Sequence, residues 1–174
     1  MGVKTRHVQG ELIPSEADLR CGGGPDEKYV VKHFCGKTLE EASNMFAENA
    51  EFYGGDLLWM GVKGYFYYIH AIKKYLRSDE GKYNMQVYSE TLGYMKLRME
   101  QEPEFRAAFV EHREEILGIL QLIKTNLEDY IANHDEDEEY LFSIYHEIPG
   151  MLSECIAYCG ADTPSDMVCP SPKS

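Results

Sequence analysis

The residues with the most chemical potential lie in the stretch 56–77, which opens with DLLWMGVKG and continues as an aromatic and basic segment. Asp56, Tyr67 and His70 could serve an enzyme if the fold placed them in one pocket beside Trp59. In an enzyme, burial and neighbouring charges shift the pKa values of such groups. A pocket that perturbs a carboxylate or a histidine would therefore favour catalysis. The sequence alone assigns no catalytic residue.

A basic cluster follows on one face of the helix expected from residue 64 onward. Its spacing of three and four residues is typical of one helical face. Such a cluster is the one basic patch on an acidic chain, and it could dock an acidic partner or a small anion. The same spacing also fits an ordinary solvated face with ion pairs to neighbouring helices. Together with the preceding loop, it gives the predicted binding residues: Asp56, Trp59, Lys63, Tyr67, His70, Lys74 and Arg77.

Metal and cofactor motifs are missing from the sequence. The acidic run 135–139 is not an EF-hand loop, because a register starting at Asn133 puts Glu138 where glycine is required. No Glu-x-x-His or His-Glu-x-x-His pair occurs. Cys155 and Cys159 lack the spacing and further ligands of a zinc site. P-loop, dinucleotide and Gly-x-Ser-x-Gly motifs are also missing. The sequence therefore predicts no metal and no cofactor.

Composition excludes several partners. The net charge of −13 argues against nucleic acid, since phosphate contacts need a concentrated positive surface. Residues 135–174 hold most of that charge, with one basic and nine acidic residues, net −8. No apolar run approaches the length of a membrane span, and the N-terminus has no signal-peptide core. Five scattered cysteines indicate reduced thiols, so we expect a cytoplasmic protein.

Helical spacing of apolar residues dominates the chain, and 44% of its residues are hydrophobic. Thr38 with Glu41 forms a capping box that opens the first confident helix. A last helix is expected from the acidic run onward, with a kink at Pro149–Gly150. The other predicted helices span 38–53, 64–78, 84–101 and 104–133. The predicted fold is all-α, a single-domain irregular bundle of about five helices.

The predicted organisation has three parts. Residues 1–27 form a flexible or extended N-terminal arm, with a short helix possible from Ser15 to Arg20. Residues 28–160 form the helical domain, and residues 161–174 form a frayed tail. Within the domain, the β-branched segment 29–34 is expected to be extended coil, because no second strand is available to pair with it.

Trp59 is the only tryptophan. Its apolar neighbours in sequence and the glycine-bracketed turn after it predict a core anchor, tucked under the aromatic helix beside Phe46 and Phe66. The alternative places Trp59 on the rim of a cleft, where a partner would cover it.

A resemblance can be stated on two motifs. FCGKTLEEASNMF (34–46), followed by DLLWMG (56–61) and an aromatic helix, resembles a group of small bacterial proteins of uncharacterised function that share F-x-G-K-T-L-E-E-A and W-M-G elements. The resemblance covers residues 34–78 and implies no activity, so no functional residue is carried over. The expected function is a small acidic protein-binding module of the inhibitor, immunity or adaptor type. The alternative is an enzyme with a pocket near Trp59, Tyr67 and His70.

Overall fold

The computed structural model of the 174-residue chain describes residues 7–8, 11–22, 24–133, 143, 146, 148–150 and 153. Their regular structure is helical, apart from a hairpin in which strands β1 (His7–Val8) and β2 (Glu11–Leu12) pair antiparallel. The predicted all-α class is therefore confirmed. Among the described helices, none combines the length and the apolar composition that crossing a bilayer requires.

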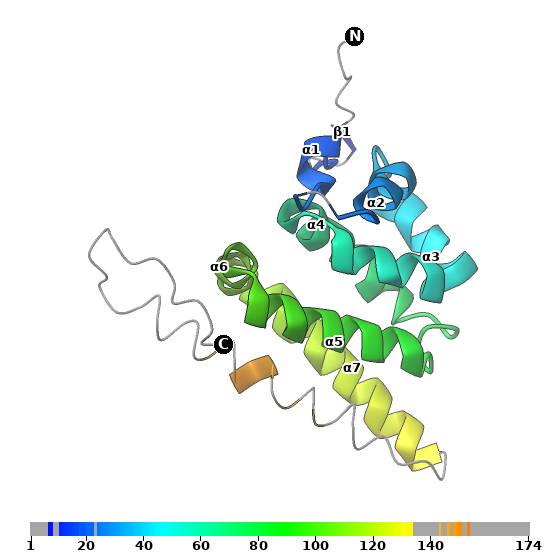
Figure 1. The fold of residues 1–174 in the computed structure, drawn as a ribbon. Helices are drawn as coiled ribbons and strands as arrows, with labels where there is room; N and C mark the ends of the chain where they lie inside the picture. The colour runs from blue at the N-terminus through cyan, green and yellow to red at the C-terminus, as the bar shows by residue number, and fades with distance from the viewer. Residues whose placement is uncertain are drawn as a thin grey trace. The chain divides into compact units, whose positions relative to one another are not determined.

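The described helices are more numerous and shorter than the five or so predicted (Figure 1). They are α1 (Glu16–Leu19), α2 (Glu27–Phe34), α3 (Leu39–Gly54), the 3₁₀ helix η1 (Gly55–Trp59), α4 (Val62–Tyr75), α5 (Met85–Gln101), α6 (Pro103–Glu111) and α7 (Arg113–Asn133). The chain divides into two compact units, Met1–Glu90 and Thr91–Ser174, with the boundary inside α5.

The core of the first unit is aromatic. The Phe34 ring lies 4.9 Å from the Tyr68 ring and 6.0 Å from the Phe46 ring, measured between centroids, and all three side chains are fully buried. These rings come from α2, α4 and α3 in turn, so one aromatic cluster joins three helices. The predicted capping box at the start of α3 is present. Thr38 Oγ1 accepts the Glu41 N–H, and the Glu41 carboxylate accepts the Thr38 N–H.

The segment 29–34 was predicted to be extended, and this is wrong, because it forms most of α2. Val30 and Phe34 are four residues apart and both are fully buried. A helix places such a pair on one face, where it meets the core, whereas β-branched composition alone favours a strand. Tertiary burial has overridden local propensity here.

Helix α1 belongs to the packed core of the first unit. Its capping box uses Ser15 and Asp18, in the position where the sequence allowed a short helix. Leu19 is fully buried, and its carbonyl accepts the Gly61 N–H at 2.8 Å. Residues from the predicted N-terminal arm thus supply core contacts at the start of α4. A Cβ at Gly61 would lie 2.5 Å from the Asp18 carbonyl oxygen, so only glycine allows this close approach.

The prediction of Trp59 as a core anchor is wrong, because 37% of this residue is exposed. Trp59 ends η1, in which Asp56 and Leu57 are buried, and Met60, which follows with extended backbone, is buried as well. The apolar side chains that this segment turns into the core are therefore Leu57 and Met60. One edge of the indole packs against Gly24, where a Cβ would lie 3.3 Å from Trp59 Cε3.

In the second unit, the helix predicted over 104–133 is two helices. The break lies at His112 (φ −97°, ψ 22°), between α6 and α7. The His112 N–H still donates to the Ala108 carbonyl, and the apolar stripe stays buried on both sides at Phe109 and Ile116. Neither glycine nor proline marks this position, so the sequence carries no signal for the break.

A buried arginine also lies in the second unit. Arg98 in α5 is 1% exposed, and its Nη2 lies 2.9 Å from a Glu102 carboxylate oxygen. Its guanidinium carbon lies 4.2 Å from the centre of the Phe105 ring, which is the geometry of a cation–π contact. The contacts of Arg98 with Glu102 and Phe105 join the end of α5 to the start of α6. The helix predicted over 84–101 is confirmed as α5, and four of its residues at helical spacing, Tyr88, Leu92, Met95 and Met99, are fully buried.

Several predictions concern residues outside those described. The acidic run 135–139, Cys155, Cys159 and the tail 161–174 are among them. Of the last predicted helix, residues 143, 146, 148–150 and 153 are described, and all of them are helical.

Replacing Gly61 with alanine should lower the free energy of unfolding by about 1–3 kcal/mol, the usual range for forcing extra atoms into a packed site. The new methyl group would collide with the Asp18 and Arg20 carbonyls and push α1 off α4. Urea denaturation of the variant measures the loss. Gly55→Ala is the matched control, since a Cβ there meets no atom within 4 Å and the backbone is already helical. Equal stability of the two variants would contradict the packing described here.

Candidate functional site

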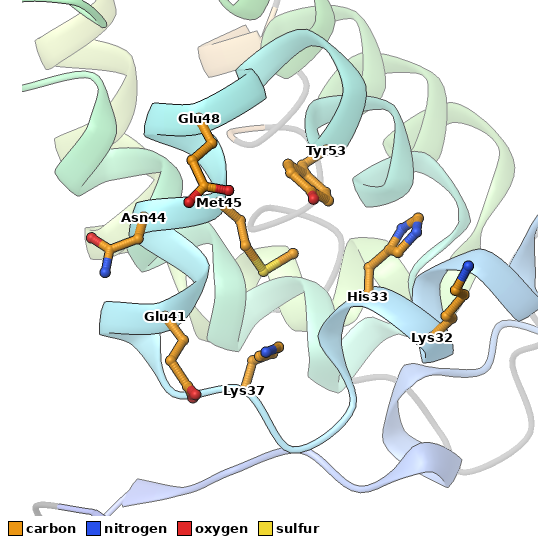
Figure 2. Close-up of a pocket in the computed structure, with 8 residues that line it drawn as sticks. All are labelled: Lys32, His33, Lys37, Glu41, Asn44, Met45, Glu48 and Tyr53. Carbon is orange, nitrogen blue, oxygen red and sulfur yellow. The ribbon is translucent and has the colours of Figure 1, made fainter.

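A hollow of about 420 Å³ lies between α2 and α3 of the first unit (Figure 2). Helix α2 contributes two of its side chains, the following loop contributes one, and α3 contributes the rest. We call it the α2–α3 hollow, and its lining residues are Lys32, His33, Lys37, Glu41, Asn44, Met45, Glu48 and Tyr53.

The Tyr68 side chain of α4 is hydrogen-bonded to the backbone at both ends of the turn between α2 and α3. The Tyr68 hydroxyl lies 2.6 Å from the Phe34 carbonyl oxygen and 2.8 Å from the Lys37 carbonyl oxygen, and it donates toward both. Burial of the phenol raises the pKa of Tyr68 well above its usual range, so it remains a donor. Because Lys37 is tied to the core through its backbone, the edge of the hollow is fixed.

His33 is oriented by a buried carboxylate. Its Nδ1 lies 2.7 Å from Asp56 Oδ2, and only 15% of the His33 side chain and 11% of the Asp56 side chain are exposed. Desolvation raises the pKa of Asp56, and the bond from His33 opposes that rise. With Asp56 ionised, the Nδ1–H donates to the carboxylate, and Nε2 is left to bind or exchange a proton.

Aromatic rings surround His33. The Tyr29 ring stacks on it at 6.3 Å with an interplanar angle of 27°, Phe52 lies at 5.3 Å, and Tyr53 approaches edge-on at 5.6 Å. We call these four residues, Tyr29, His33, Phe52 and Tyr53, the aromatic ridge. Tyr29 is 44% exposed and Phe52 is 56% exposed, whereas most large aromatic residues of the first unit are buried. The ridge adjoins the α2–α3 hollow, because His33 and Tyr53 belong to both.

A break inside α3 sets the position of Phe52. Asn49 has non-helical backbone angles (φ −159°, ψ 78°), and its side-chain oxygen accepts the Phe52 N–H at 3.1 Å. This is the bonding of a helix N-cap, so the last turn of α3 starts anew at Asn49. The new turn carries Phe52 and Tyr53 toward His33.

The charges around the hollow are separated by element. Lys32 on α2 and Lys37 in the loop are positive, and Glu48 on α3 is negative. Within the described part of the chain, none of these three side chains forms an ion pair. Glu41 differs, because the α3 capping box holds its carboxylate.

The predicted site residues divide between this site and other surfaces. Asp56 lies here, as the partner of His33. Lys63 pairs with Asp18 at 3.3 Å, at the junction of α4 and α1. Along α4, Tyr67 and His70 are half-buried, and Lys74 is exposed. The remaining two predicted residues, Trp59 and Arg77, are exposed as well. None of the predicted pocket residues Trp59, Tyr67 and His70 lines the α2–α3 hollow.

Sequence reasoning missed His33, Tyr29 and Phe52. The usable signal was the spacing of Tyr29 and His33, which are four residues apart and therefore neighbours on a helix. In an extended segment the two residues would lie about 13 Å apart along the chain, so treating 29–34 as extended hid the pair. For Phe52, the signal was an asparagine three residues earlier.

The chain matches no family model, no curated protein and no solved structure in comparisons with known proteins.

Tyr68→Phe should cost about 1–3 kcal/mol of stability, since it removes the hydroxyl that donates to the Phe34 carbonyl in the core and to the Lys37 carbonyl in the loop. Hydrogen exchange of the amides in residues 35–38 should accelerate at the same time, because the loop loses its anchor. Tyr83→Phe, at an exposed residue, is the control and should change stability by less than about 0.5 kcal/mol. Unchanged exchange in the loop of Tyr68→Phe would show that the phenol does not hold it.

Asp56→Asn should change how stability depends on pH. The folded protein raises the pKa of Asp56 above the unfolded value of about 3.9, so this group favours folding below that value and loses its contribution as pH rises through the folded pKa. Asparagine keeps an acceptor for the His33 Nδ1–H and cannot ionise. The free energy of unfolding of the variant minus that of the parent should therefore rise as the pH increases from about 4 to neutrality. A difference that stays constant over that range would contradict the raised pKa.

Proposed function

We propose that the chain is a protein-binding module whose contact surface is the aromatic ridge together with the α2–α3 hollow. The observation that carries this proposal is the exposure of Tyr29 and Phe52, whose rings both pack on a carboxylate-held histidine. Aromatic residues near a pocket are the residues that most often dominate the energy of protein interfaces.

Pre-organisation supports the proposal. Tyr29 and Phe52 each pack on His33, and Asp56 fixes the His33 ring. Side chains already held in place lose less conformational entropy when a partner covers them. The ridge is therefore poised to bind without rearrangement.

The segment that carries the resemblance to small bacterial proteins supplies Lys37, Met45 and Asp56 to this surface. An inhibitor, immunity or adaptor role needs such a surface and no chemistry. We place the protein in the cytoplasm, in keeping with the exposed free thiol of Cys35. The net charge of −13 favours a protein partner over nucleic acid.

An enzyme is the second candidate, and the Asp56–His33 pair favours it. A carboxylate that holds imidazole Nδ1 leaves Nε2 able to act as a general base. An enzyme would lose its turnover in His33→Gln and keep it in Tyr29→Ser, whereas a binding module would be more sensitive to the loss of the exposed ring.

Photo-crosslinking tests the binding function. A benzophenone amino acid at position 52, expressed in the native cell, should capture a specific protein, and the same group at position 83 should not. Tyr83 is the control because it is also exposed and lies in the same unit. Loss of an interface hot spot costs about 2 kcal/mol. Tyr29→Ser should therefore weaken binding of the purified partner about thirtyfold. Its melting temperature should be nearly unchanged.

Capture of the same proteins from positions 52 and 83 would contradict the proposal. Equal affinity of the parent and Tyr29→Ser for the purified partner would do so as well.

A further inference from the structure

We infer that the α2–α3 hollow receives one face of an amphipathic partner helix, with an apolar stripe flanked by acidic side chains on one side and basic side chains on the other. This inference rests on the proposed binding function and names the chemistry of the partner. The charges that line the hollow indicate what charges the partner must carry.

The two sides of the hollow carry opposite charges. Lys32 projects from α2 and Lys37 from the loop that follows, while Glu48 projects from α3 (Figure 2). These charges form no ion pair with each other or with another described residue. A partner can therefore pair with them without breaking an existing interaction. Its acidic flank would face α2, and its basic flank would face α3.

Two of the lining residues offer apolar surface to a partner. Met45 is half-buried, and Tyr53 lines the hollow as well. Methionine is flexible and adapts to partners of different shape. A space of about 420 Å³ has room for a few apolar side chains but not for a whole helix. The partner therefore lays its stripe over the hollow and inserts side chains from it.

The shape of the α3 side favours a helix. Glu41, Met45 and Glu48 follow a spacing of four and three residues, which is one face of a helix about 10 Å long over two turns. A partner helix that lies along this face presents side chains with the same repeat. A peptide that binds by adding a β-strand would instead need an exposed sheet edge. Among the described residues, the only strands are β1 and β2, with two residues each.

Charge separation also sets the direction of the partner. A helix can lie over the α2–α3 hollow in two opposite directions, and reversing the direction exchanges its two flanks. Only one direction therefore puts the acidic side chains against Lys32 and Lys37. A helix with two acidic flanks would meet Glu48 with like charge, and one with two basic flanks would meet the lysines. Like-charge contacts of this kind exclude wrong partners.

Three helical peptides with the same leucine stripe test the inference. One has a Glu flank and a Lys flank, one has Glu on both, and one has Lys on both. Binding is followed by the NMR signal of the Met45 methyl group. Two exposed ion pairs contribute on the order of 1 kcal/mol in total. The mixed peptide should therefore bind about fivefold more tightly than either of the others at low salt. The preference should fade at about 0.5 M NaCl, where screening is strong.

Charge reversal should switch the preference. Lys32→Glu with Lys37→Glu makes both sides acidic, so the all-Lys peptide should then bind best. Asn44→Lys with Glu48→Lys makes both sides basic, so the all-Glu peptide should then bind best. The control is Arg113→Glu with Lys124→Glu in the second unit, which changes the net charge as much as the first pair and should still prefer the mixed peptide. These positions are mostly exposed, and circular dichroism checks that each variant stays folded.

Failure to perturb Met45 with any peptide, or a preference that the reversals do not switch, would overturn the inference. The proposed function would survive that result if the crosslinker at position 52 still captured a partner in a Tyr29-dependent way. If neither the peptides nor the crosslinker at position 52 gave the expected result, the proposed binding surface itself would be rejected.

Discussion

The first unit depends on one buried phenol. Tyr68 lies in the middle of α4, its ring packs on Phe34, and its hydroxyl donates to the carbonyl that ends α2 and to the loop beyond. A buried carbonyl without a donor is costly, and the ends of helices have several such groups. The Phe34 carbonyl also accepts the Lys37 N–H, and Gly36 turns the chain with a positive φ of 75°. Tyr68 adds a bond from α4 to each end of this turn, and so ties the end of α2 and the loop before α3, which edges the α2–α3 hollow, to the core.

Desolvation and the bond to His33 act against each other at Asp56. Burying a carboxylate disfavours its charged form, which is why the pKa of Asp56 is raised. The bond to His33 recovers part of that cost and fixes the imidazole between Tyr29 and Phe52. An apolar residue at position 56 would avoid the penalty, but it would leave the His33 ring free to turn. Such an arrangement is expected where a fixed orientation of His33 matters more than the folding free energy lost by burying the Asp56 carboxylate.

The sequence predicted the elements that local rules determine. The capping box at Thr38 and the helix over 84–101 follow from nearest neighbours along the chain, and both appear in the structure, as the start of α3 and as α5. The turn predicted between Gly61 and Gly64 is shorter than expected, because α4 already begins at Val62. Burial of α2 depends on contacts with α3 and η1, which lie at least five residues away in sequence, and local propensity indicated the wrong state for it. Trp59 was misplaced for a similar reason. Its apolar neighbours in sequence do not show which of them turns inward, and the structure buries Leu57 and Met60 while the indole stays partly exposed.

The candidate site was harder to predict, because it depends on irregularities. Of the seven predicted binding residues, Asp56 alone is bonded to a residue of the aromatic ridge. Asn49 interrupts α3, and its side chain replaces a backbone acceptor for Phe52. An uninterrupted α3 would carry Phe52 on a face set by the regular repeat of 100° per residue. The break changes that direction, and the ring then reaches His33 while more than half of it stays exposed. A helix loses backbone hydrogen bonds at such a break, and local rules that favour continuous helices will always argue against it. Departures of this kind gather at functional sites, where placing a side chain outweighs regularity. The break at Asn49 is therefore physical support for locating the binding surface at the aromatic ridge, and it is independent of the charges that line the hollow.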